Sequence, residues 1–267
     1  MVIMQIFTKT SKGDVSTHAL VTSLEEVYER ALSYLNNVVE RTGRPGFRVA
    51  TGEFHRTRLT VVLHPIGPSA LAILLEELAR LGTDVVLYLD AATALSPKVD
   101  IGSVILATGA IKGDGVSKAY APLEVPAIPS HELFHHVQQS LEVHDIKTIP
   151  GIVWSVDTFY LNGGAIEASM KTYSRLAVAM DMGTATLFTV AMTRKLQATS
   201  VLVVESSVPK GVERGAIYSE EEEYETLHQK IFSVIDKLVK PLLEALSLHM
   251  EHVKVSKAAT QIEATTP

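Results

Sequence analysis

Two acidic residues directly follow short apolar runs whose composition is typical of buried strands. Asp90 follows residues 85–89, and Glu205, with Ser206 after it, follows residues 200–204. A carboxyl group at a strand end can bind a neutral ligand, accept a hydrogen bond from a local N–H group or help to form a turn. Because side chains alternate between the two faces of a strand, Glu205 can turn into a site on the other face only where the strand ends or bulges.

A third carboxylate, Asp181, precedes Met182 and Gly183 just before a predicted apolar helix. In an extended segment Asp181 and Gly183 face the same side, so Asp181 could reach a ligand there. The alternative is a helix N-cap or a structural carboxylate. Phe159 and Tyr160 form an aromatic pair that could stack on a planar ligand or pack in the core.

Other constellations with known chemistry are missing from the sequence. His135 and His136 are adjacent and cannot share one helical face, and no metal-ligand set, P-loop or nucleophile elbow is present. The chain has no cysteine, which excludes disulfides and thiol catalysis and fits a reducing compartment. We therefore expect no metal and no cofactor.

Composition places the chain among globular proteins with a large core. It has 267 residues, 46% of them hydrophobic, and a formal net charge of -6. No basic footprint suggests a nucleic-acid or membrane partner, and no apolar run is long enough for a membrane helix. We expect a cytoplasmic protein.

Apolar runs alternate with helical patterns along the chain, which predicts one α/β domain over residues 1–253. We expect a single mixed, twisted sheet with helices on both faces, and a mobile tail at residues 254–267. Strand 59–63, helix 68–81 and strand 85–89 predict a parallel pair of strands joined by a crossover. The predicted strands are 47–51, 59–63, 85–89, 104–107, 149–154 and 200–204, and the predicted helices are 68–81, 129–143, 184–195 and 220–249, with Ser130 as an N-cap.

Several short motifs, in order, resemble those of the nucleoside phosphorylases that include hexameric purine nucleoside phosphorylase and uridine phosphorylase. They are Ser11–Val15 (SKGDV), His64–Ser69 (HPIGPS), Ile111–Ser117 (IKGDGVS), Tyr120–Ala127 (YAPLEVPA), Ser155–Tyr160 (SVDTFY), Ala179–Phe188 (AMDMGTATLF) and the strand Val201–Val204. The joint order of these motifs over some two hundred residues implies the fold of that family.

The resemblance also implies a reaction: cleavage of the glycosidic bond of a nucleoside by phosphate, giving a base and a pentose 1-phosphate. It implies that Phe159 and Tyr160 stack on the base and that Glu205 and Ser206 occupy the place of the acid. At the sugar motif, Met182 is kept and Gly183 replaces the family's ribose-binding glutamate, with Asp181 nearby.

The phosphate-binding elements depart most from the family pattern. The first loop falls at residues 23–27, where the glycine and arginine are gone and Ser23 is expected to cap a helix. In the second, Tyr88 and Asp90 replace an arginine and a glycine, so we class both as candidate substrate contacts. Arg44 and Arg48 could supply the missing positive charge to the phosphate site of a neighbouring subunit.

The expected partners are therefore a nucleoside or base, and phosphate if the site still holds an anion. Family sites are completed across a subunit boundary, so a homo-oligomer is expected, either dimers or a trimer of dimers. The alternative is a homologue without catalysis that serves as a structural or regulatory subunit or as a binder of nucleosides or bases.

Overall fold

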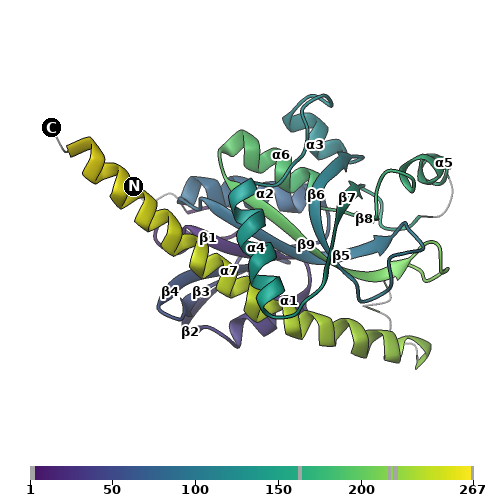
Figure 1. Cartoon of the computed structure of the whole chain (residues 1–267), viewed down its shortest axis with the longest axis horizontal. Helices are drawn as coiled ribbons and strands as arrows, with labels where there is room; N and C mark the ends of the chain where they lie inside the picture. The colour runs from purple at the N-terminus through teal and green to yellow at the C-terminus, as the bar shows by residue number, and fades with distance from the viewer. Residues whose placement is uncertain (1–3, 162–163, 216–217, 219–221, 266–267) are drawn as a thin grey trace.

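The computed structural model describes residues 4–161, 164–215, 218 and 222–265, and these form a nine-stranded mixed sheet (Figure 1). The strand order is β2-β3-β4-β1-β5-β8-β7-β6-β9. The strands are β1 (His18–Thr22), β2 (Asn36–Thr42), β3 (Arg48–Phe54), β4 (Thr57–Leu63), β5 (Val85–Ala94), β6 (Val104–Lys112), β7 (Thr148–Ser155), β8 (Ala179–Asp181) and β9 (Gln197–Ser207).

The predicted crossover pair is present, but with a strand between its members. β4 and β5 do not pair with each other, because β1 lies between them and is parallel to both. The sequence analysis missed β1, whose five residues are all buried and show no alternation of polar and apolar side chains. The single α/β domain with a mixed sheet is confirmed.

The strands also close into a ring, which the sequence analysis did not predict. β5 pairs with β8 and, along its whole length, with β9, so that β5, β8, β7, β6 and β9 form a closed circuit. In the β5–β9 ladder, Ala92 opposes Val204 and Thr93 opposes Ser206. Glu205 is therefore an extra residue on β9, which is a β-bulge.

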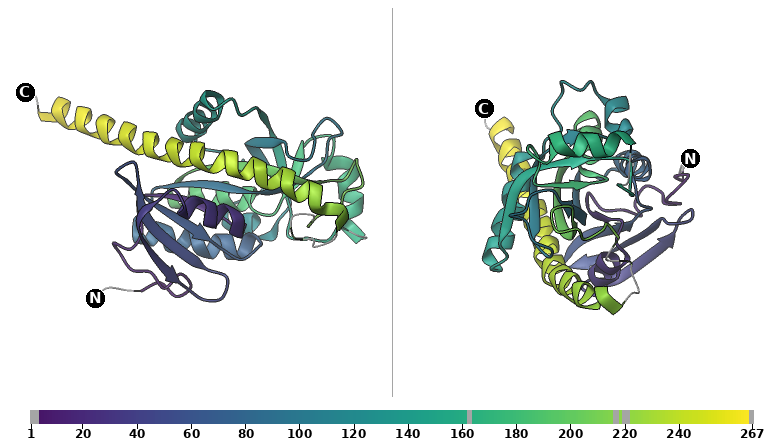
Figure 2. Two further views of the ribbon diagram at one scale, coloured as in Figure 1. Left: turned by 90° about the horizontal axis from the view of Figure 1, so that it is seen from below. Right: turned by 90° about the vertical axis from the view of Figure 1, so that its right-hand side faces the viewer.

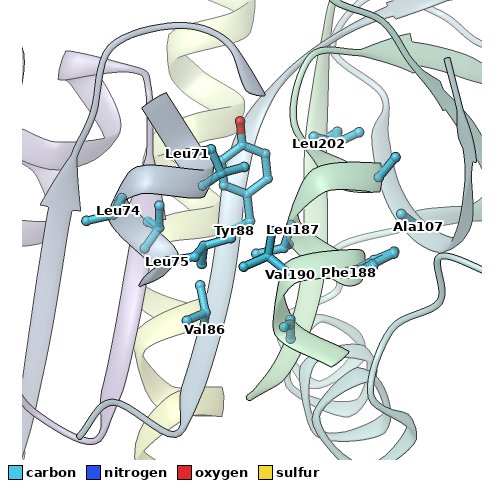
Figure 3. Close-up of a cluster of buried hydrophobic side chains, with 14 of the residues drawn as sticks. Leu71, Leu74, Leu75, Val86, Tyr88, Ala107, Leu187, Phe188, Val190 and Leu202 are labelled. Atoms are coloured by element: carbon cyan, nitrogen blue, oxygen red, sulfur yellow. The ribbon is translucent and has the colours of Figure 1, made fainter. Parts of the chain in front are cut away.

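Helices cover both faces of the sheet, as predicted, and each face has its own core. The helices are α1 (Glu25–Leu32), α2 (Pro68–Leu81), α3 (Gly115–Tyr120), α4 (His131–Val143), α5 (Gly164–Tyr173), α6 (Thr184–Arg194) and α7 (Glu225–Thr265). α2 and α6 pack against one face, where leucines of α2 meet Leu187 and Val190 of α6 across Tyr88 (Figure 3). α1, α4 and α7 cover the other face (Figure 2).

Two helix caps show how local sequence sets the boundaries. α2 has the predicted bounds: Pro68 begins it, and Gly82 ends it in the left-handed conformation at φ 95°. Ser130 precedes α4 as predicted, but its hydroxyl does not cap the helix. Instead the Ser130 Oγ accepts a hydrogen bond from the backbone N–H of Ala198, which joins the start of α4 to β9.

The last helix is longer than predicted. α7 runs from Glu225 to Thr265 and extends well past the sheet (Figure 1), and residues 220–221 of the predicted helix lie outside the described part. The backbone of residues 254–265 continues as helix, and the mobility expected for this tail stays a prediction. Of the helices in the described residues, none combines the length and apolar character needed to span a bilayer.

Candidate functional site

Two adjoining hollows lie at the end of the β5–β9 ladder and share Phe159 and Arg214. We call them the inner cleft, of about 430 Å³, and the outer hollow, of about 710 Å³, both counted with their open mouths. The inner cleft is lined by Ser23, Ile66, Gly67, Tyr88, Asp90, Ala91, Ala92, Phe159, Met182, Glu205, Arg214 and Tyr218.

Six of the ten predicted site residues line one or both of these hollows. The inner cleft contains Tyr88, Asp90, Phe159, Met182 and Glu205, and the outer hollow adds Tyr160, which is 78% exposed. Asp181, Ser206, Arg44 and Arg48 do not line the inner cleft. Of these four, Ser206 follows Glu205 on β9 and donates its hydroxyl to Thr93, which lines the outer hollow.

The carboxylate of Asp90 is buried and bonded within its own chain. Its Oδ2 accepts the Ser23 backbone N–H at 3.0 Å, and its Oδ1 accepts the Ser23 hydroxyl at 2.9 Å and the Ala91 N–H at 2.8 Å. Asp90 lies inside β5, which continues to Ala94, so the turn alternative was wrong and the alternative of a local N–H group is confirmed. The predicted cap at Ser23 was also wrong, because Leu24 occupies the cap position and the Ser23 hydroxyl bonds Asp90 instead.

The bulge on β9 meets the condition that the sequence analysis set for Glu205. The extra residue turns the Glu205 side chain into the inner cleft, where it is 3% exposed. Its Oε1 and Oε2 accept the Gly215 N–H at 3.1 and 3.3 Å. Ser206, by contrast, points its hydroxyl at Thr93 at 2.9 Å, on the neighbouring strand.

Arg214 is the most important site residue that the sequence analysis missed. Its guanidinium lies 5.7 Å from the ring centre of Phe159, and its Nε and Nη1 donate to the Thr93 hydroxyl and the Thr158 carbonyl, both at 3.0 Å. Burial lowers the pKa of Arg214, and the charges of Glu205, Asp181 and Asp90 oppose that shift. The cleft therefore holds a cation between an aromatic ring and a carboxylate.

A turn after β9 explains why Arg214 was not found. Ser207 and Val212 form an isolated antiparallel bridge, which returns the chain over the end of the ladder and brings Arg214 and Gly215 back to Glu205. The available signal was an arginine nine residues after an acid, in a loop with no periodic pattern. Only the fold joins two such residues.

Tyr88 fills the place where a side chain at position 183 would lie. A Cβ built on Gly183 would come within 2.6 Å of the Tyr88 hydroxyl oxygen and 2.8 Å of its ring. Figure 3 shows the Tyr88 ring between α2 and α6, with its hydroxyl pointing away from the apolar cluster. Burial, followed by the nearby Asp90 and Asp181 charges, raises the pKa of Tyr88, so the phenol stays protonated. The two residues that depart from the family pattern here are sterically coupled.

The carboxylate of Asp181 is occupied by the start of α6. It accepts hydrogen bonds from the hydroxyl of Ser155, the backbone N–H groups of Gly183 and Thr184, and the Thr184 hydroxyl. Burial raises the pKa of Asp181, and these hydrogen bonds oppose that effect. This geometry favours the structural alternative for Asp181, while Met182 next to it lines the inner cleft.

The two candidate phosphate arginines lie apart from the cleft of their own chain. Arg48 bonds Glu40, Glu25 and Glu29 through its guanidinium. Arg44 lies over the ring of Phe7 at 5.8 Å and donates to a backbone carbonyl. Their role in binding phosphate stays a prediction that requires a neighbouring copy of the chain.

No metal centre is found in the part of the chain that the structure describes. There, no three His, Asp or Glu side chains gather as they would around a metal ion. The lining of the cleft is that of a site for an organic ligand. Phe159 and Arg214 lie at one end, and Tyr88 lies at the other with Asp90, whose carboxylate is hydrogen-bonded within its own chain.

Comparison with known proteins gives one consistent result. The model of the phosphorylase superfamily matches residues 17–240. A guanosine phosphorylase of Halorubrum lacusprofundi is 27% identical over 201 residues, covering 75% of this chain and 80% of that protein. A uridine phosphorylase of Thermococcus kodakarensis is 28% identical over 212 residues, covering 75% and 76%.

Solved structures agree in fold. The purine nucleoside phosphorylase of Toxoplasma gondii in complex with immucillin-H superposes with a TM-score of 0.82 at 20% identity, covering 92% of this chain and 97% of the other. The uridine phosphorylase of Vibrio fischeri ES114 superposes with a TM-score of 0.79 at 25% identity, covering 91% and 96%. The chain therefore belongs to the phosphorylase superfamily, within the nucleoside phosphorylase family.

Proposed function

We propose that this protein cleaves the N-glycosidic bond of a nucleoside in the inner cleft and releases the free base. The observation that carries the proposal is the bulge that turns Glu205 into the cleft, beside Phe159 and Arg214. A carboxyl group, a cation and an aromatic ring at one end of a cleft suit a planar base that leaves with the bonding electrons.

In this proposal each group at that end has one task. Phe159 stacks on the base, and Tyr160 borders the outer hollow beside it. Glu205 donates a proton to the departing base, and the charge of Arg214 stabilises the carboxylate that remains. Tyr88 and Met182 contact the sugar from the other end, where the phenol oxygen of Tyr88, whose O–H donates to Asp90, can accept a hydrogen bond from a sugar hydroxyl.

The named relatives support a nucleoside as the substrate class. They are called guanosine phosphorylase and uridine phosphorylase, which implies phosphate as the attacking group and pentose 1-phosphate as a product. A carboxyl group at the base end suits purines, which gain from a proton on the leaving base. We therefore propose a role in purine salvage.

We further propose a cytoplasmic homo-oligomer, either dimers or a trimer of dimers. The exposed edge strand β2, with Val39 60% exposed, offers a surface that another copy could cover. Arg44 and Arg48 would contribute to a site only from such a copy. The absence of cysteine fits a reducing compartment. Light scattering on the purified protein measures the oligomer directly.

The decisive experiment incubates the full chain with a panel of purine and pyrimidine nucleosides and follows base release by chromatography. We expect release of at least one base, and a fall in kcat of about a hundredfold or more in Glu205→Gln, because the general acid is lost. Glu142→Gln, on the exposed side of α4, is the matched control and should keep full activity.

Two results would contradict this proposal. Glu205→Gln with wild-type kcat would remove Glu205 from the reaction. Absence of base release from every nucleoside, together with thermal stabilisation by one of them, would instead favour a binding protein without turnover.

A further inference from the structure

We propose that this cleft prefers nucleosides whose sugar lacks the 2′-hydroxyl, and that Tyr88, packed against Gly183, sets this preference. The preference rests on the proposed function, because it names the class of nucleoside that the same site cleaves. The residues concerned lie at the end of the inner cleft that holds Tyr88 and Met182, opposite Phe159 and Glu205.

Two carboxylates lie near the phenol of Tyr88, and both are already used within the chain. Asp90 accepts three hydrogen bonds from Ser23 and Ala91, at 2.8 to 3.0 Å. Asp181 accepts four at the start of α6 and does not line the inner cleft. Two neighbouring sugar hydroxyls are best bound by the two oxygens of one ionised carboxylate. The described residues that line this end offer no carboxylate with both oxygens free for that task.

Position 183 cannot supply the missing carboxylate either. Gly183 follows Met182 of the lining, and the Tyr88 hydroxyl oxygen lies 2.6 Å from the place where a Cβ at position 183 would stand. Figure 3 shows the Tyr88 ring held between α2 and α6, where leucines of both helices surround it. The sugar end therefore presents an aromatic phenol where a longer, charged side chain has no room.

The phenol oxygen of Tyr88 offers a neutral acceptor to the sugar. Its O–H donates to Asp90, and burial raises its pKa, so the group carries no charge. The lone pairs of the oxygen can still accept a hydrogen bond from one sugar hydroxyl. A 2′-deoxyribose has one hydroxyl on its ring, at C3′, whereas ribose has two. The second hydroxyl of ribose would lose its bonds to water on entering the cleft without gaining an equal partner.

The chemistry of the sugar favours the same substrates. In the proposed reaction the bond between C1′ and the base nitrogen breaks, its electron pair leaves with the base, and the base takes a proton from Glu205. A phosphate oxygen forms the new bond to C1′, which gives a free base and a pentose 1-phosphate. Positive charge develops at C1′ on the way, and a 2′-hydroxyl withdraws electrons from that carbon. A nearby anionic acceptor would offset this effect, but the neutral phenol of Tyr88 does so only weakly.

The test compares guanosine with 2′-deoxyguanosine at saturating inorganic phosphate and follows base release by chromatography. The two nucleosides carry the same base, so their ratio of kcat/KM reports on the sugar end alone. We expect kcat/KM to be about tenfold or more higher for 2′-deoxyguanosine, because a hydroxyl left without a partner carries a penalty of that order. Uridine and 2′-deoxyuridine, run in parallel, show whether the preference is independent of the base.

Tyr88→Phe tests the phenol oxygen without opening the space beside Gly183. It removes the acceptor for the 3′-hydroxyl, so the ratio of kcat/KM for 2′-deoxyguanosine to that for 2′,3′-dideoxyguanosine should fall about tenfold. Tyr120→Phe is the matched control, because its phenol donates to Glu76, away from the cleft, and the ratio should stay at the wild-type value. An unchanged ratio in Tyr88→Phe would refute the role of Tyr88.

Equal or higher kcat/KM for guanosine than for 2′-deoxyguanosine would overturn the inference while upholding the proposed function. If no nucleoside is cleaved, the proposed function fails, and calorimetric titration with the same two nucleosides still tests the sugar preference. Binding of 2′-deoxyguanosine that is about tenfold tighter supports the preference. Binding of 2′-deoxyguanosine that is equal, weaker or absent refutes it.

Discussion

The two ends of the inner cleft use their charged groups in different ways. At the end formed by Ser23, Tyr88 and Asp90, the carboxylate accepts three hydrogen bonds from its own chain. At the end formed by Phe159, Glu205 and Arg214, a cation, a carboxylate and a ring face one hollow that opens into a second. A site can thus convert one half into internal structure while the other half keeps groups arranged for a ligand.

The largest effect that separates the two ends is expected at Arg214. Replacing it with glutamine removes the positive charge beside Glu205, and the loss of one preorganised charge of this kind typically costs a factor of about 100 in kcat. Steady-state kinetics of base release measures the change, with the exposed Arg175→Gln as the control. An Arg214→Gln enzyme with wild-type kcat would mean that this end is structural as well.

Ser23 should behave in the opposite way, as a contributor to stability. Ser23→Ala deletes a hydroxyl bonded to the buried Asp90 carboxylate, and such a bond to a charged group is worth about 1.5–3 kcal/mol. Denaturant unfolding should show that loss. Ser33→Ala, whose hydroxyl donates to a carbonyl on the exposed end of α1, should change the free energy of unfolding much less. Equal losses in the two variants would argue against a special Asp90 network.

A variant at Gly183 tests whether the Tyr88 end of the cleft can still accept a side chain at position 183. Gly183→Ala places a Cβ 2.6 Å from the Tyr88 hydroxyl and should destabilise the fold by about 1–3 kcal/mol. Adding Tyr88→Ala should relieve that clash, so the double variant should lose less than the sum of the single variants. Gly109→Ala, with no contact closer than 3.5 Å, is the control. Additive losses would show that the two positions are not coupled.

The smallest expected difference lies within the Phe159 end. Phe159→Leu should raise KM for the nucleoside by roughly fivefold, because stacking on an aromatic base is worth about 1 kcal/mol. Tyr160→Leu should have a weaker effect, since Tyr160 is 78% exposed and borders only the outer hollow. A larger effect at Tyr160 would place the base in the outer hollow.

Much of this arrangement could be predicted from local sequence. Helix α2 has its predicted bounds because proline, a leucine stripe and glycine are all local signals. The motif order identified the family, and the positions of Phe159, Met182 and Glu205 in the cleft agree with it. The condition placed on Glu205 was also local, because alternation along a strand requires a bulge to change the face of a side chain.

What could not be predicted depends on contacts between distant segments. Nothing in the sequence near Ser23 indicates that its hydroxyl bonds Asp90, a residue 67 positions away, rather than capping a helix. The coupling of Tyr88 with Gly183 and the return of Arg214 to Glu205 are likewise set by the closed ring of strands. In the sequence, the departures from the family pattern at Tyr88 and Gly183 look independent. In the fold, the Tyr88 ring fills the space that a side chain at position 183 would occupy.

The ring of strands also bears on how the site is assembled as the chain is made. Asp90 lies on β5 and Glu205 on β9, and the two strands pair although more than a hundred residues of chain separate them. Pairing over such a distance is slow to form, because the entropy cost of closing a long loop comes before any stabilising contact is made. A nascent chain that ends before β9 has one carboxylate and no cleft, so the capacity to act on a ligand arises in a single late event of folding.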